Sequence, residues 1–151
     1  MQLGHVPLAL SVASFNWSPK MALFCLGMHY LPNADSLVAK AGFAKPDFHC
    51  TVTHTFAFAI AVTAIVFLIA PAYAPFAFVA LVTHYLADLG STVGLPLFWP
   101  ITKKRFTLSL FKDTGYWGWE MYKGYYSQPM PWVLEGATLL FFGWRMAQVY
   151  A

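Results

Sequence analysis

The sequence predicts an all-α integral membrane helical bundle, in which a short N-terminal helical hairpin precedes three longer membrane helices. Charged residues make up only 10% of the chain, whereas a typical soluble domain has about 25%. Hydrophobic residues make up 59%, and the mean hydropathy is +0.56. Short segments rich in Pro, Gly and Asn separate the apolar runs. The length suits one domain, so residues 1–151 are predicted to form a single membrane-embedded domain.

Two short apolar runs come first, at residues 6–15 and 20–31. Each is shorter than the roughly 20 residues that a membrane span requires. The segment Asn16-Trp-Ser-Pro19 between them is a turn signal. The two runs therefore form either a half-depth helical hairpin or one broken helix. Pro19 favours the hairpin, because proline suits the first turn of a new helix.

The central part of the chain predicts a second, longer hairpin. Residues 53–70 and 76–89 are apolar, and the turn at residues 71–75 is too short for anything but an antiparallel connection. Residues 90–128 are amphipathic and rich in Trp and Tyr, which is typical of a membrane interface. Residues 131–150 form the last apolar helix, which has spanning length.

Basic residues are distributed unevenly around the hairpin of residues 53–89. Seven lie in the loops before and after it, and two, Lys20 and Arg145, lie elsewhere. This asymmetry predicts that the loop face is cytoplasmic. The net charge of +3 is small and the basic residues form no polar stripe, which argues against nucleic-acid binding and leaves membrane lipids as the predicted partners. The seven residues are Lys40, Lys45, Lys103, Lys104, Arg105, Lys112 and Lys123.

The pair His84 and Asp88 gives the strongest functional signal. The two residues are four positions apart, so they lie one turn apart on one helix face. Ionisable groups in or at the end of a membrane helix are costly and usually mark a site. A histidine with a carboxylate is also a common metal-ligand pair. Gly90 follows and ends the helix.

Further ionisable residues are predicted at the same membrane face, because each lies near the end of a predicted segment. Each residue taken alone has a structural interpretation as a helix cap, a turn residue or a first-turn charge. A purely structural explanation of the whole set would require all of these interpretations to be correct together. His29 is instead interpreted as structural, since it lies in a short apolar run. The predicted metal ligands are His5, Asp35, His49, His54, His84, Asp88 and Glu135.

This combination of imidazoles and carboxylates predicts a divalent metal, with zinc as the leading candidate. A bound metal lowers the pKa of its water and makes a hydroxide nucleophile near neutral pH. Cys25 is predicted to be a core residue, whereas Cys50 lies between two histidines and is an additional candidate ligand. Lys103, Lys104 and Arg105 are interpreted first as a positive-inside signal and second as contacts for phosphate head groups.

Several segments resemble the motifs of one family. The segment His49-Cys-Thr-Val-Thr-His54-Thr55 resembles the motif H-R-x-x-T-H-S. The segment from His84 through Asp88, Thr92 and Gly94 to Pro100 resembles a second motif, and Leu31-Pro-Asn-Ala-Asp35-Ser36 resembles the turn L-P-D-x-D-S. Together with the N-terminal His5, these segments resemble the YdjM-type, LexA-regulated, inner-membrane metal-dependent hydrolases, which are similar in pattern to zinc-dependent phospholipase C.

The resemblance implies a multi-pass protein of the bacterial inner membrane. It also implies metal roles for Asp35, His54, His84 and Asp88, and by weaker matches for His5, His49 and Glu135. The chain departs from the pattern at two positions. Asn33 stands where an Asp is usual, which removes one carboxylate, and Cys50 stands where an Arg is usual, which removes a cation that could pair with phosphate.

The leading hypothesis is therefore a metal-dependent hydrolase that acts on a phosphoester or lipid head group at the cytoplasmic membrane face. Asp35 or Glu135 is the predicted general base, although a carboxylate that binds metal is a poorer base. The alternative is a non-catalytic small subunit that keeps the fold within a larger complex, with other membrane protein subunits as partners. A transporter is disfavoured, because the sequence shows no inverted repeat and the polar residues gather at one face.

Overall fold

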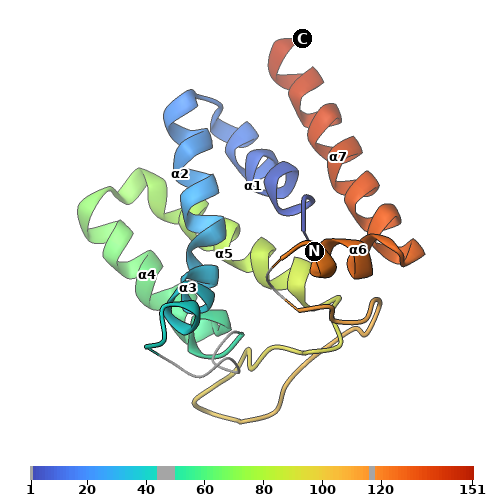
Figure 1. The fold of residues 1–151 in the computed structure, drawn as a ribbon. Coiled ribbons are helices and arrows are strands. Elements are labelled where there is room, and N and C mark those ends of the chain that lie inside the picture. Colours follow the sequence, from blue (N-terminus) through green and yellow to red (C-terminus); the bar gives the residue numbers. More distant parts are fainter. Residues whose placement is uncertain (1, 44–49, 116–117) are drawn as a thin grey trace.

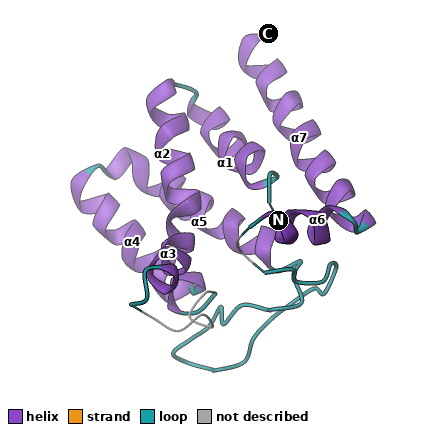
Figure 2. Cartoon of the chain, viewed as in Figure 1, coloured by secondary structure: helices purple, strands orange, loops and turns teal. Residues whose placement is uncertain are grey.

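The computed structural model describes residues 2–43, 50–115 and 118–151, and these form a helical bundle (Figure 1). The predicted all-α class is confirmed: in these ranges, pairing of extended backbone is limited to isolated bridges, and loops join the helices (Figure 2). The α-helices of the described ranges are α1 (His5–Ala13), α2 (Pro19–Tyr30), α3 (Ala34–Lys40), α4 (Phe56–Ile69), α5 (Ala74–Asp88), α6 (Trp119–Tyr126) and α7 (Pro129–Tyr150).

The N-terminal segment forms the predicted hairpin and not one broken helix. Helices α1 and α2 are separate and pack against each other. Pro19 occupies the first turn of α2, and the Ser18 hydroxyl caps this helix by accepting a hydrogen bond from the Met21 amide at 3.1 Å. Helix α7 then packs along α1, so both ends of the chain belong to one bundle (Figure 1).

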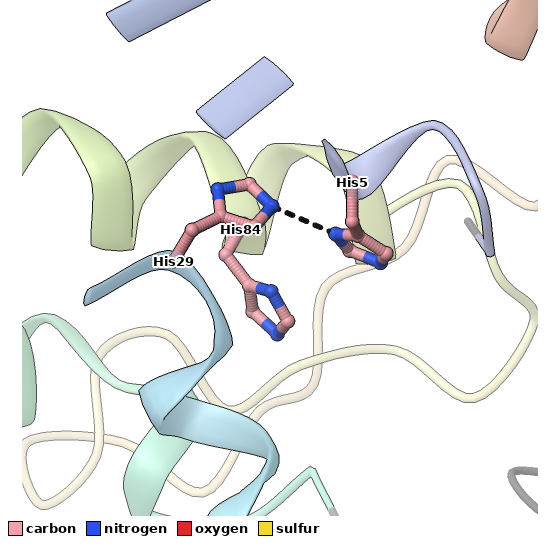
Figure 3. A group of neighbouring side chains, drawn as sticks. All are labelled: His5, His29 and His84. Carbon is pink, nitrogen blue, oxygen red and sulfur yellow. Dashed lines mark hydrogen bonds between the residues drawn. The ribbon is translucent and has the colours of Figure 1, made fainter. Parts of the chain in front are cut away.

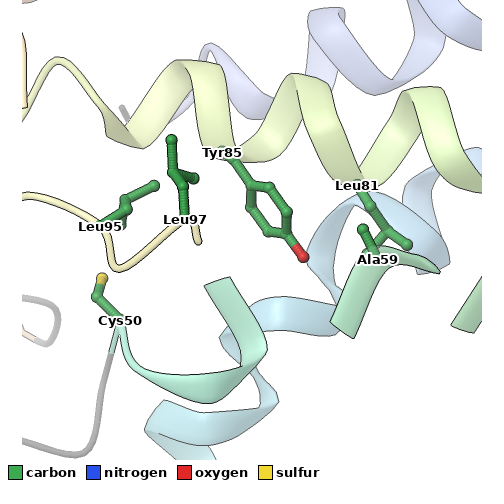
Figure 4. Packing of buried hydrophobic residues seen from close by; sticks show 6 residues of the cluster. All are labelled: Cys50, Ala59, Leu81, Tyr85, Leu95 and Leu97. Atoms are coloured by element: carbon green, nitrogen blue, oxygen red, sulfur yellow. The ribbon is translucent and has the colours of Figure 1, made fainter. Parts of the chain in front are cut away.

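Helix α5 lies at the centre of the bundle and packs against α1, α2 and α4. A short 3-10 turn, Pro71–Tyr73, joins α4 to α5 as an antiparallel pair. Leu81 and Tyr85 of α5 face Ala59 of α4 in a buried apolar cluster that also contains loop residues (Figure 4). The Tyr85 hydroxyl donates a hydrogen bond to the Thr53 carbonyl at 2.9 Å, which ties the start of α4 to α5.

The loop after α5 folds back over the carboxyl end of that helix. The backbones of Leu95 and Phe106 exchange hydrogen bonds of 2.8 and 2.9 Å. Glycine at position 90 allows a close approach, because a Cβ atom there would lie 2.5 Å from the Phe111 ring and would force the ring to move. Arg105 fastens the loop: its guanidinium donates to the carbonyls of Gly94 and Cys50 at 2.8 and 3.0 Å.

Among the described residues, no helix combines the length and the apolarity needed to cross a bilayer. The prediction of three longer membrane helices is therefore not supported. Helices α4 and α5 have 14 and 15 residues, short of the roughly 20 that a span requires. Helix α7 has 22 residues, but Glu135 and Arg145 interrupt its apolar sequence.

Candidate metal centre

Five ionisable side chains meet where helix ends converge around the last turns of α5. His5 begins α1, His29 lies in the last turn of α2, and Asp35 lies in the first turn of α3. His54 ends the 3-10 turn just before α4, and His84 lies on α5. All five are buried. Asp88, one turn after His84, is the sixth member, and 15% of its side chain is exposed.

Three atoms form the first ligand group, which we call the His–His–Asp group: Nε2 of His54, Nε2 of His84 and Oδ2 of Asp88. The two nitrogens are 3.3 Å apart, and Oδ2 is 3.1 Å from His84 and 3.7 Å from His54. A tetrahedral metal with bonds of about 2.0–2.1 Å holds its ligand atoms roughly 3.3–3.4 Å apart. The three atoms therefore already have nearly the spacing of one face of a zinc tetrahedron.

Asp35 contacts this group through His54. Its Oδ2 lies 3.3 Å from Nδ1 of His54 and accepts hydrogen bonds from the Thr53 hydroxyl at 2.7 Å and the Cys50 amide at 3.0 Å. A carboxylate behind a histidine fixes the ring orientation and leaves the other nitrogen free to bind metal. The geometry thus gives Asp35 the position of a residue that orients a ligand.

A second group consists of His5, His29 and His84. Each offers a ring nitrogen that lies within 4.8 Å of those of the other two. Figure 3 shows the rings gathered beside α5, with Nδ1 of His5 and Nε2 of His29 in contact at 2.9 Å. Nε2 of His5 lies 3.1 Å from Oδ1 of Asp88. One carboxylate therefore contacts both groups through its two oxygens.

Burial and neighbouring charged groups together set the protonation of this cluster. Burial, reinforced by the neighbouring imidazoles, lowers the pKa of His29 to about 2, and burial lowers the pKa of His84 to about 3. Both rings are therefore neutral at pH 7, the form that binds metal. Burial opposes ionisation of Asp88 too, but the adjacent His5 and His84 outweigh it and hold the Asp88 pKa well below its usual value. Burial would lower the pKa of His54, but Asp35 and Asp88 raise it well above its usual value.

A cavity of about 740 Å³ reaches the cluster from outside. His5 and Asp88 lie in its wall, together with Asn33, Arg105 and Lys112. The wall of the cavity therefore contains both candidate metal ligands and basic side chains. Such a wall is suited to an anionic substrate that binds next to a metal ion.

Residues 5–150 match the family described as YdjM inner membrane protein. The chain belongs to the YdjM inner membrane protein family. No curated protein and no solved structure matches it.

In this YdjM-family chain, the geometry separates the predicted ligands. His5, His54, His84 and Asp88 contribute atoms to the two groups, and Asp35 contacts His54. Glu135 is not brought into either group. Its carboxylate accepts hydrogen bonds from the Gln2 amide at 2.9 Å and the Tyr126 hydroxyl at 2.8 Å, because α7 packs beside the amino end of α1. His49 lies outside the described residues.

Sequence analysis missed His29, whose apolar surroundings suggested a structural role. Its ring is buried, contacts His5 and belongs to the second group. One signal could have found it: His29 precedes Asp35 by six residues, at the end of the predicted hairpin and thus at the same level as the other candidates. Cys25 is buried in the apolar core, as predicted, and Cys50 lies in the wall of the cavity.

Proposed function

We propose that the chain is a metal-dependent hydrolase that acts on a phosphoester, such as a lipid head group, at a membrane face. One observation carries this proposal: the His–His–Asp group has the spacing of metal ligands and opens through Asp88 into the cavity. A structural metal is enclosed by four protein ligands, whereas a catalytic metal keeps one position open. The cavity therefore favours a hydrolase over a non-catalytic subunit.

The donor set fits a divalent metal, with zinc as the leading candidate, since it offers two imidazole nitrogens and a carboxylate oxygen. When bound, such a metal would polarise a phosphoryl oxygen and lower the pKa of a water molecule. The protein would supply the orientation: the fold holds His54 and His84 fully buried, and Asp35 fixes the ring of His54. Only Asp88 meets both the ligand group and the cavity.

Arg105 is the residue we assign to substrate binding. The family pattern has an Arg where this chain has Cys50, and Arg105 lies beside that position, with Nη2 3.0 Å from the Cys50 carbonyl. Arg105 lines the same cavity as Asp88. A guanidinium pairs well with phosphate oxygens. Arg105 thus provides, from a different segment, the cation that the pattern places at position 50.

The general base remains a proposal with two predicted candidates. Neither Asp35 nor Glu135 lines the cavity. Oδ2 of Asp35 already accepts two hydrogen bonds besides its contact with His54, and the Glu135 carboxylate accepts two of its own. We therefore assign Asp35 a positioning role and expect Glu135 to matter for packing between α1 and α7.

The test is hydrolysis by the purified full-length chain. A generic phosphodiester and phospholipid vesicles would each be incubated with protein that has been stripped by a chelator and then reloaded with Zn²⁺. We expect metal-loaded protein to hydrolyse at least one of the two substrates, stripped protein to be inactive, and Zn²⁺ to restore the rate. Tight metal binding without hydrolysis of either substrate would instead support the non-catalytic subunit.

We further propose that exposed apolar side chains of α4 and α7 contact lipid. The chain's family is one of inner membrane proteins. At the end of α4, Leu68 is 82% exposed and Ile69 79% exposed, a cost in water that lipid contact would remove. The seven-to-two distribution of basic residues supports a cytoplasmic position for the site face. On α7 the exposed apolar residues include Trp132, Val133, Leu139, Leu140, Phe141 and Trp144.

Replacing both Leu68 and Ile69 by serine is expected to shift the chain from the membrane toward the soluble fraction, because it removes the two most exposed large apolar side chains of α4. Cell fractionation with an alkaline wash measures the shift. Glu120→Gln is the matched control, since Glu120 is exposed and pairs only with Lys123 among the described residues. An unchanged membrane fraction in the serine variant would contradict lipid contact at this hairpin.

A further inference from the structure

We propose that His5, His29 and His84 bind a second divalent metal beside the His–His–Asp group, which makes the site a two-metal centre. The inference rests on the proposed function only in that both groups share His84. It assigns His29, which the family motifs do not contain, as a ligand.

The first support is convergence. The three rings come from three different helices, α1, α2 and α5, and each places a nitrogen within 4.8 Å of the other two (Figure 3). All three side chains are buried, so packing holds the rings in place and their convergence is a property of the fold. Three imidazoles are a common protein ligand set for a catalytic zinc, with a fourth position left open.

The second support is the tautomer of His29. Its Nδ1 lies 3.0 Å from the Ala80 carbonyl, which can only accept, so Nδ1 carries the hydrogen and donates it. Nε2 therefore carries a lone pair, and it is the nitrogen that faces His5. A histidine whose far nitrogen donates to a backbone carbonyl is the usual arrangement of a metal ligand.

The third support is an unsatisfied atom. Nδ1 of His84 is buried and has no hydrogen-bond partner within the part of the chain that the structure describes. Nε2 of the same ring faces His54 and Asp88 in the first group. Buried polar atoms nearly always have a partner, and each exception calls for an explanation such as an ion. We infer that the ring offers one nitrogen to each group, with Nδ1 serving the second metal. Because a neutral imidazole has a lone pair on only one nitrogen, the ring would release its remaining N–H proton to solvent when the second metal binds and would bridge the two ions as an imidazolate.

Asp88 completes the arrangement. Its Oδ1 lies 3.1 Å from Nε2 of His5, while Nδ1 of His5 contacts His29. Nε2 of His5 therefore faces a carboxylate oxygen, and Nδ1 faces the second group. A metal on Nδ1 would leave the Nε2–Asp88 contact intact. Asp88 would then bind the first metal directly and orient a ligand of the second.

Metal titration of the purified full-length chain tests the proposal. The protein would be stripped with a chelator and titrated with Co²⁺, whose visible absorption reports each bound ion, and the bound Zn²⁺ would be counted by elemental analysis. We expect two equivalents in the unaltered chain. The variant His29→Phe, which keeps a ring of similar size, is expected to lose one equivalent and keep the other, and His54→Ala to lose the other one.

The retained equivalent in each variant also shows that the variant has folded. If the unaltered chain binds one equivalent and His29→Phe does not reduce it, the second metal is wrong while the proposed hydrolase stands. Two equivalents that both survive His29→Phe would also overturn the assignment of His29. If no variant and no preparation of the unaltered chain binds metal, both the second metal and the proposed function fail.

Discussion

Replacing Asp88 by alanine is expected to abolish metal binding by the His–His–Asp group and to reduce phosphodiester hydrolysis by about a thousandfold. Asp88 supplies the only charged ligand of this group, and its Oδ2 lies 3.1 Å from Nε2 of His84. A catalytic metal contributes several kcal/mol of transition-state stabilisation. Because each 1.36 kcal/mol corresponds to a tenfold rate change, the loss of about 4 kcal/mol gives roughly this factor.

Elemental analysis and the hydrolysis rate measure the two parts of this expectation on the same sample. Asp88→Asn keeps the shape of the side chain but not its charge, so it should retain more metal than Asp88→Ala and less than the unaltered chain. The double variant His84→Ala, Asp88→Ala should lose the metal altogether. Full metal content in the double variant would reject the site, and Glu120→Gln serves again as the control on a distant carboxylate.

The part of this centre that depends on local periodicity was predictable from sequence. The spacing of His84 and Asp88 places them on one face of any helix that contains both, and α5 does. The tight turn at residues 71–75 required antiparallel neighbours, so the carboxyl end of α5 had to return to the amino end of α4 near His54. Pro19 likewise marked the start of α2.

The part that depends on packing between distant segments was not predictable. The role of His29 follows from its hydrogen bond to the Ala80 carbonyl, 51 residues along the chain, and no sequence pattern specifies such a contact. Glu135 lies in the second turn of α7 and not at its start, where the sequence predicted it. Because α7 packs against α1, the Glu135 carboxylate accepts hydrogen bonds from Gln2 and Tyr126 instead. Composition indicated a membrane protein but did not determine helix length.

The loop after α5 shows the same limit. Its aromatic residues favoured a membrane interface, whereas its course depends on cross-loop hydrogen bonds such as those between Leu95 and Phe106. Arg105 reaches the carbonyls of Gly94 and Cys50 only because of that course. The basic cluster that contains Arg105 predicted a charge at this face, but not which of its members would line the cavity.

Substitution of Asp35 is the second change with a large expected effect. It distinguishes a residue that orients a metal ligand from one that binds the metal itself or transfers a proton. Asp35→Asn is expected to weaken metal binding by about tenfold to a hundredfold, the usual cost of changing a partner behind a ligating histidine. The amide can still accept from Thr53 and Cys50, whose donor atoms lie 2.7 and 3.0 Å from the carboxylate. The neutral group no longer polarises His54, which makes Nε2 a weaker ligand.

Competition with a chelator measures the metal affinity of Asp35→Asn, and Thr53→Val is the matched control, because it removes one hydrogen bond to the same oxygen but keeps the charge. The orienting role and the general-base role of Asp35 then differ in one experiment, the hydrolysis rate at saturating Zn²⁺. If Asp35 orients His54, excess metal restores most of the rate, since the ligand atoms of His54, His84 and Asp88 remain. If Asp35 is the general base, saturation fills the site but leaves the rate low and removes an acidic limb from the pH–rate profile. An unchanged metal affinity in Asp35→Asn would contradict the positioning role, because Oδ2 of Asp35 lies 3.3 Å from Nδ1 of a fully buried His54 and its charge cannot be screened there by water.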